Sequence, residues 1–192
     1  KFARAYYNRG LVYMRLEQYD LALREYDQAI RYDPELTEAY FNRGTIYYLI
    51  LDRDEEALKD LTRAIELNPN DAEAYFNRGQ VCKKLRRNKE ALTDYSLCIL
   101  NDPKFIHAYI ERGILYYILK QYEESLSDFT KIIQIDPNFG LAYYWRSFVY
   151  YELHQYEKAL HDLNRAIQCE TDNAEMYFHR GKLYAELQQY DE

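Results

Sequence analysis

A five-residue motif that returns at a nearly constant interval constrains this sequence more than any other feature. The pattern Tyr-x-x-Arg-Gly occurs five times, and a further copy has Ser in place of Gly. The first tyrosines of the copies lie 34, 35, 34, 34 and 34 residues apart and are Tyr6, Tyr40, Tyr75, Tyr109, Tyr143 and Tyr177. A period of this length is typical of a solenoid, whose units bury their apolar faces only by stacking on one another. We therefore expect one elongated repeat array.

Other fixed positions indicate two helices in each unit. With the motif glycine numbered as position 8, small residues recur at position 20, as Ala22, Ala57, Ala91, Ser125 and Ala159. Proline recurs at position 32, as Pro34, Pro69, Pro103 and Pro137. Positions 4, 8 and 11 share one stripe of a helix, and positions 20, 24 and 27 share a stripe of a second helix. Because proline ends a helix and small residues permit close approach, each unit should be an antiparallel helix pair and the chain all-α.

These spaced positions resemble the tetratricopeptide repeat, in its Asn-Arg-Gly variety. The resemblance divides the chain into five full repeats and one extra helix, at residues 3–36, 37–71, 72–105, 106–139, 140–173 and 174–192. It implies a right-handed superhelical solenoid whose first helices line a concave groove. It also implies a protein–protein interaction scaffold that binds a peptide or a partner helix in this groove.

Three units depart from the pattern. The second has one extra residue between Gly44 and Ala57, which should lengthen its inter-helix turn near Asp52. The fifth has Ser147 in place of Gly and Thr171 in place of Pro. The sixth contributes only a first helix, and the apolar face that this leaves open could join two chains in a homodimer.

Composition argues against several classes of function. The formal net charge of −7 disfavours nucleic-acid binding, which needs a basic surface, and no apolar run approaches the roughly 20 residues of a membrane span. Cys82, Cys98 and Cys169 have neither disulfide nor metal spacing, so we expect a cytoplasmic location, with Cys82 and Cys98 filling the core. The four histidines lack metal spacing and a neighbouring nucleophile pattern. We expect no enzymatic activity, no metal and no cofactor.

An arginine at position 7 and an acid at position 23 recur in register. The pairs are Arg9 with Glu25, Arg43 with Asp60, Arg78 with Asp94, Arg112 with Asp128 and Arg146 with Asp162. Position 7 adjoins the tightly packed glycine, so each guanidinium should be partly buried and should need a carboxylate partner. We expect each arginine to meet an acid of its own or the adjacent unit. The alternative is that the arginines line a groove and bind anionic ligands.

The groove positions divide the chain into two chemical halves. The first three units place asparagines at position 6, namely Asn8, Asn42 and Asn77. Amides can pair with an extended peptide backbone, and this row resembles the asparagine ladder of O-linked N-acetylglucosamine transferase, although Glu111 interrupts it. The fourth and fifth units place apolar residues at groove positions, namely Ile110, Ile114, Tyr117, Ile118, Leu141, Tyr144, Trp145, Phe148 and Tyr151. Exposed apolar patches with aromatic anchors mark binding surfaces, so we expect the partner to bind here, with core packing as the alternative.

Further alternatives concern the partner. The carboxylate clamp of chaperone-binding members needs polar and basic residues where this chain has Tyr7, Leu11 and Glu73, so a chaperone tail is not expected. The chain could instead be the substrate-recruiting arm of a larger enzyme such as a glycosyltransferase, or a self-association module. The basic run at residues 83–89 could be a solvated turn or a docking point for an acidic partner.

Overall fold

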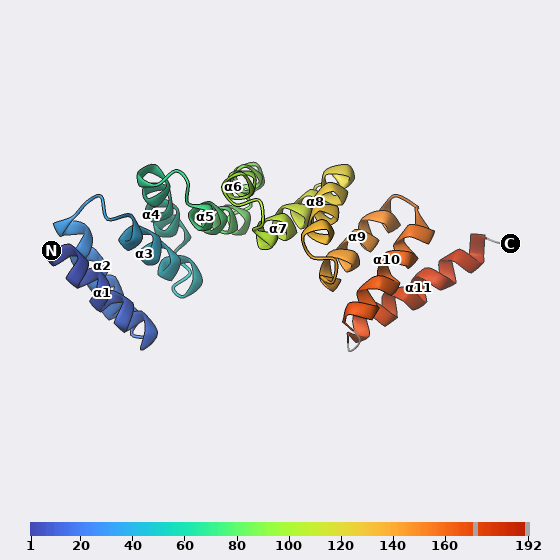
Figure 1. The fold of residues 1–192 in the computed structure, drawn as a ribbon, viewed down its shortest axis with the longest axis horizontal. Helices are drawn as coiled ribbons and strands as arrows, with labels where there is room; N and C mark the ends of the chain where they lie inside the picture. Colours follow the sequence, from blue (N-terminus) through green and yellow to red (C-terminus); the bar gives the residue numbers. More distant parts are fainter. Residues whose placement is uncertain (171–172, 191–192) are drawn as a thin grey trace. The chain divides into compact units, whose positions relative to one another are not determined.

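The protein is all-α. A computed structural model describes residues 1–170 and 173–190, with side chains up to residue 187, and these residues form eleven helices and no strand (Figure 1). The all-α prediction is confirmed. Thr171, the substitution for proline in the fifth unit, lies outside the described residues.

The helices divide between two compact units. The first unit, Lys1–Pro103, contains α1 (Phe2–Arg15), α2 (Tyr19–Tyr32), α3 (Thr37–Leu49), α4 (Asp54–Leu67), α5 (Ala72–Lys84) and α6 (Asn88–Asn101). The second unit begins at Lys104 and contains α7 (Ile106–Ile118), α8 (Tyr122–Ile135), α9 (Gly140–Glu152), α10 (Tyr156–Cys169) and α11 (Ala174–Tyr190). Each unit is a run of helix hairpins in which consecutive helices pack together.

Small residues bring the two helices of each hairpin close together. A Cβ placed on Gly44 of α3 would lie 3.4 Å from the carbonyl oxygen of Ala57 on α4. In the fourth hairpin Ser125 replaces alanine at position 20, and its buried hydroxyl donates to the carbonyl of Gly113 at 2.8 Å. The hydroxyl of Ser147 likewise donates to the Tyr144 carbonyl at 2.6 Å, so both substitutions leave no buried hydroxyl unsatisfied.

Short turns close the hairpins. Four of them have three residues between the helices, with one non-glycine residue at a φ of 56–59°, namely Glu17, Arg86, Lys120 and His154. In the first turn the Gln18 N–H bonds the Tyr13 carbonyl and the Glu17 N–H bonds the Met14 carbonyl, a pattern that satisfies the last carbonyls of α1. The turn between α3 and α4 has four residues, 50–53, so the predicted lengthening of this turn is confirmed.

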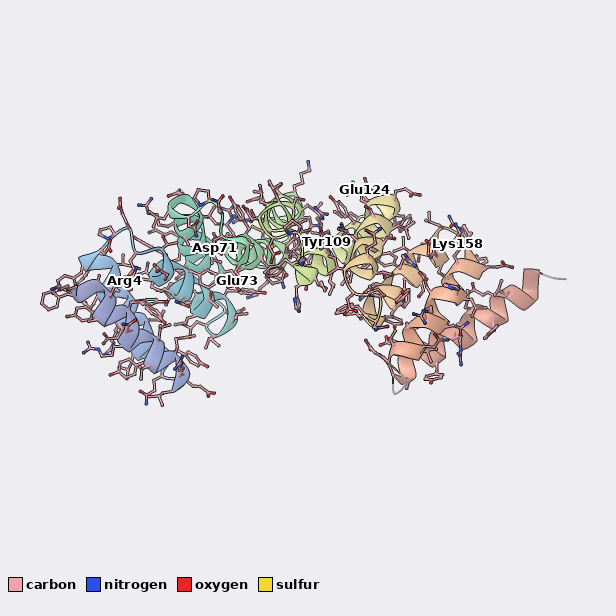
Figure 2. The ribbon with its side chains drawn as sticks, in the orientation of Figure 1. Arg4, Asp71, Glu73, Tyr109, Glu124 and Lys158 are labelled. Carbon is pink, nitrogen blue, oxygen red and sulfur yellow. The ribbon has the colours of Figure 1, made fainter. Side chains whose placement is uncertain are left out.

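Local sequence signals set several helix ends. Helices α2, α4, α6 and α8 each end two residues before a proline, as the restricted backbone before proline requires. Helix α5 begins after Asp71, which Figure 2 labels. The Asp71 carboxylate accepts the N–H of Ala74 at 3.1 Å. Cys82 and Cys98 are buried, as expected for residues that fill the core.

Candidate functional site

A bidentate arginine–aspartate ion pair joins the two helices of each hairpin from the second to the fifth. Arg43 donates from Nε to Asp60 at 2.6 Å and from Nη2 to the other carboxylate oxygen at 2.7 Å. The same contact, at 2.6–2.9 Å, joins Arg78 to Asp94, Arg112 to Asp128 and Arg146 to Asp162. The acids are almost fully buried. This geometry matches the fork of arginine to the two oxygens of a carboxylate.

A third hydrogen bond joins the same arginine to the preceding hairpin. The Nη1 atom of Arg78 donates to Thr62 at 3.3 Å, and that of Arg146 donates to Thr130 at 3.1 Å. Arg43 reaches Asp27 at 2.5 Å in the same way. The acceptors lie 16 residues before their arginines, at position 25. Arg43, Arg78 and Arg146 therefore each link three helices, which sequence reasoning did not foresee.

Arg9 is the exception. It meets Glu25 at 2.8 Å, but its side chain is 57% exposed, because none of the described helices covers it as α2 covers Arg43. The Arg43 side chain is only 17% exposed. Burial opposes the charge of Arg43, yet the hydrogen bonds that it donates to Asp60 and Asp27 outweigh burial and raise its pKa above the usual range.

The alternative role of the arginines, anion binding, can be weighed at a cavity of the first unit. This cavity of about 930 Å³ is lined by Arg43 and Arg78, but also by Asp60 and Asp94, which pair with them. The paired charges leave little positive potential for an anion. The arrangement favours a structural role.

The asparagines of the first unit connect neighbouring hairpins. Asn42 donates from Nδ2 to the Tyr7 hydroxyl at 3.0 Å, and Asn77 donates from Nδ2 to the Thr45 hydroxyl at 3.3 Å. Asn8 is exposed. The side-chain N–H groups of Asn42 and Asn77 thus already donate hydrogen bonds to described residues. Their side-chain carbonyl oxygens remain to accept hydrogen bonds.

The basic run at residues 83–89 contacts acids of the preceding hairpin. Lys84 pairs with Asp52 and with Asp54, the latter at 2.7 Å, and Arg87 meets Glu55 at 2.8 Å. The longer turn of the second hairpin provides Asp52, and the first turn of α4 provides Asp54 and Glu55. Part of the basic charge is therefore balanced inside the chain.

The second unit contains an apolar cavity at the predicted groove. It has a volume of about 220 Å³ and is lined by Tyr117, Phe148 and Tyr151, with Leu163 and Leu183 beneath them. The three groove residues are half-buried. An apolar cavity of this size, open at one side, fits a single long side chain.

The Trp145 ring lies close to two of the aromatic residues that line this cavity. Its ring centroid lies 6.2 Å from that of Tyr117 and 5.8 Å from that of Phe148, and it stacks on Phe129 at 6.4 Å. Trp145 is half-buried, as are Ile114 and Leu141.

Two residues expected in the groove belong to the core instead. Ile110 and Tyr144 are only 9% and 6% exposed. The Tyr144 ring packs against Phe148 at 4.9 Å and against His179 of α11 at 6.0 Å. Position 5 therefore faces the next hairpin in the fifth unit, and core packing, the alternative expected for this set, applies to these two residues.

Tyrosine hydroxyls bind carboxylates across neighbouring hairpins of the second unit. Tyr117 and Tyr122 each donate to Glu152 at 3.3 Å, and Tyr151 donates to Glu186 at 2.6 Å. Burial, together with the Glu152 charge, raises the pKa of Tyr117 to about 12, so this hydroxyl keeps its proton at neutral pH. These contacts were not predicted from the sequence.

Other kinds of site were sought in the part of the chain that the structure describes. No group of three or more His, Cys, Asp or Glu side chains there could hold a metal ion. None of the helices searched is both long enough and apolar enough to span a bilayer.

Stacked helix hairpins with a cavity lined by first-helix residues define the class of helical-repeat proteins. Family models described as TPR repeat match residues 10–50, 48–85 and 148–188. Models described as tetratricopeptide repeat match residues 72–105, 107–139 and 129–161. The chain belongs to the tetratricopeptide repeat family.

Several solved structures share the fold. A MamA protein is 21% identical with a TM-score of 0.82, over 91% of this chain and 94% of its own. YrrB, described as a TPR protein with an unusual peptide-binding site, is 24% identical with a TM-score of 0.80, over 92% of this chain and 90% of its own. A tetratricopeptide repeat protein from Parabacteroides merdae is 21% identical with a TM-score of 0.84, over 96% of this chain and 73% of its own. No curated protein matches the sequence significantly.

Proposed function

We propose that the chain is a protein-interaction module that binds an extended peptide or a partner helix on the first-helix face of its second unit. The open apolar cavity lined by Tyr117, Phe148 and Tyr151 carries this proposal. Aromatic residues around a pocket are the side chains that most often dominate binding energy. The peptide-binding site named for the YrrB structure, which shares the fold, supports the same class of function.

The asparagine row of the first unit has a secondary role in this proposal. The carbonyl oxygens of Asn42 and Asn77 can accept N–H groups of an extended backbone, while their donors hold neighbouring hairpins together. No catalytic step is part of the proposed function. The unpaired cysteines fit a reducing compartment, so we place the protein in the cytoplasm.

Selection from a random dodecapeptide library tests the proposal. An enriched peptide, labelled with fluorescein, is titrated with the protein while its polarisation and the emission of Trp145 are recorded. Trp145 is the single tryptophan and lies beside Phe148, so its emission should change on binding. The Phe148→Ala, Tyr151→Ala double variant should bind at least about 30-fold more weakly, because loss of a hot spot costs about 2 kcal/mol or more.

A matched control removes one phenylalanine and one tyrosine elsewhere. Phe2 and Tyr32 are mostly exposed in the first unit, and the Phe2→Ala, Tyr32→Ala variant should bind as the wild type does. The proposal is refuted if no peptide is enriched, or if the cavity variant and the control bind the peptide equally well.

Self-association is a second candidate function. Tyr177, Phe178 and Tyr184 of α11 are exposed, and a Cβ on Gly181 would meet nothing within 4 Å. A Cβ on Gly113 would lie 3.0 Å from Phe129, because a second helix covers that stripe. The open stripe of α11 could cover its counterpart in a second chain. Light scattering should then give a dimer mass that the Tyr184→Glu variant loses, and a monomer at all concentrations would exclude this function.

A further inference from the structure

We infer that the cavity of the second unit takes an arginine side chain of the bound peptide, with its aliphatic stem among the aromatic rings and its guanidinium at Glu152. This inference rests on the proposed function and specifies its ligand. The side chain of arginine is apolar along its stem and charged only at its tip, which matches a cavity with apolar walls and an acid at the mouth.

Two hydrogen bonds orient the carboxylate of Glu152. It lines the cavity together with Tyr117, and it accepts hydrogen bonds from Tyr117 and Tyr122 at 3.3 Å each. Both donors are neutral, so they orient the carboxylate without balancing it. Glu152 is exposed and makes no ion pair with any described residue. A fixed negative charge beside an apolar cavity is suited to a cationic guest.

Two further aromatic rings lie beside Tyr117, which lines the cavity and donates to Glu152. The Tyr117 ring centroid is 6.0 Å from that of Tyr122 and 6.2 Å from that of Trp145. A guanidinium is planar and weakly hydrated, and it stacks on such rings more readily than an ammonium group does. Arginine should therefore bind more tightly than lysine.

The first unit shows the same arrangement with its cation present. Lys84 occupies position 13, as Glu152 does, and its Nζ lies 5.6 Å from the ring centroid of Tyr48, which shares position 12 with Tyr117. Lys84 also pairs with the carboxylates of Asp52 and Asp54. Here the chain itself places a cation over the tyrosine and beside carboxylates. In the second unit an acid replaces that lysine, so tyrosine and carboxylate are present and the cation is left for a ligand.

The remaining charges on this face agree with a basic ligand. The groove positions of the second unit carry Glu111, Glu152, Glu175 and Glu186 against a single lysine, Lys182. Lys182 lines the cavity, but its Nζ lies 5.6 Å from the ring centroid of Phe178, on α11. Four acids against one base should draw a positively charged peptide to this surface.

The test uses peptides enriched from the random dodecapeptide library described above. We expect enriched sequences to share an arginine at one position, and its replacement by norleucine to raise the dissociation constant about tenfold, with lysine in between. Glu152→Gln should weaken the arginine peptide about tenfold and leave the norleucine peptide unchanged. Glu152→Lys should reverse the preference, so that a glutamate peptide binds better than the arginine peptide.

The matched controls are Glu157→Gln and Glu157→Lys, which make the same charge changes at an exposed position of α10 outside the cavity. They should alter neither affinity nor preference. If enriched peptides bind at the cavity but lack a basic residue, or if Glu152→Lys leaves the preference unchanged, the arginine inference is wrong while peptide binding stands. If no peptide is enriched on the wild type, both the inference and the proposed function fail.

Discussion

The buried ion pair between Arg146 and Asp162 should be worth far more to stability than the exposed pair between Arg9 and Glu25. The Asp162 side chain is 2% exposed and that of Arg146 is 15% exposed, and two hydrogen bonds of 2.6 and 2.9 Å join them. Replacing Asp162 by Asn leaves a buried guanidinium without a counter-charge, which costs about 3–5 kcal/mol. Because Arg146 keeps some contact with solvent, we expect the lower end, about 3 kcal/mol.

Urea unfolding followed by the emission of Trp145 measures this loss in the second unit, where Trp145 lies. With a denaturant dependence of about 1–3 kcal/mol per molar urea, a loss of about 3 kcal/mol lowers the midpoint by about 1–3 M. The double variant Arg146→Met, Asp162→Leu should recover most of the midpoint, because no buried charge remains.

The comparison variant is Glu25→Gln in the first hairpin, followed by far-UV circular dichroism. Its partner Arg9 is 57% exposed and can be solvated when the acid is removed, so the midpoint should hardly change. Equal shifts for Asp162→Asn and Glu25→Gln would refute the reasoning, as would a double variant no more stable than Asp162→Asn alone.

Two further predictions concern packing and pH. Gly181→Ala should stabilise the protein by about 0.5–1 kcal/mol in thermal unfolding, because alanine favours the helix and its Cβ meets open space. Gly79→Ala should destabilise the protein, because its Cβ would lie 2.8 Å from a buried tyrosine ring. The opposite order of stability would show that the glycines do not mark helix contacts. Burial raises the pKa of Cys82 from 9.0 to about 11 and that of Cys98 from 9.0 to about 12. Below pH 9 both thiols keep their protons in the folded and the unfolded chain, so their contribution to the free energy of unfolding is fully present. This contribution is lost as the pH rises toward 11–12, because only the unfolded chain ionises the thiols in that range. Between pH 9 and 11 the wild type should therefore lose more of its urea midpoint than the Cys82→Ala, Cys98→Ala variant, and parallel losses would contradict this account.

The contacts within a hairpin could be predicted from the sequence better than those between hairpins. The partner of Arg146 within its hairpin follows from two positions that the period fixes and that carry the same chemistry in each unit. The acceptor of its third hydrogen bond, Thr130, could not be foreseen, because position 25 changes type along the chain, from Asp27 to Thr62 to Thr130. A position that varies gives no recurring pattern.

The cavity of the second unit was only partly predictable for a related reason. The sequence places Tyr117, Phe148 and Tyr151 on the same face of their helices, and the structure brings these three together at one cavity. The contact of Tyr117 with Glu152 depends on the angle at which one hairpin stacks on the next, which helix periodicity does not specify. The burial of Tyr144 depends on the same angle.

The hydrogen bonds of each position-7 arginine determine which cuts in the chain leave charged side chains without their partners. A break placed between hairpins leaves Arg146 with its own carboxylate and removes only the neutral contact with Thr130. A break placed inside the hairpin separates Arg146 from Asp162 and leaves each charge without its partner. A chain that is cut between hairpins should therefore be more stable than a chain that is cut between α9 and α10.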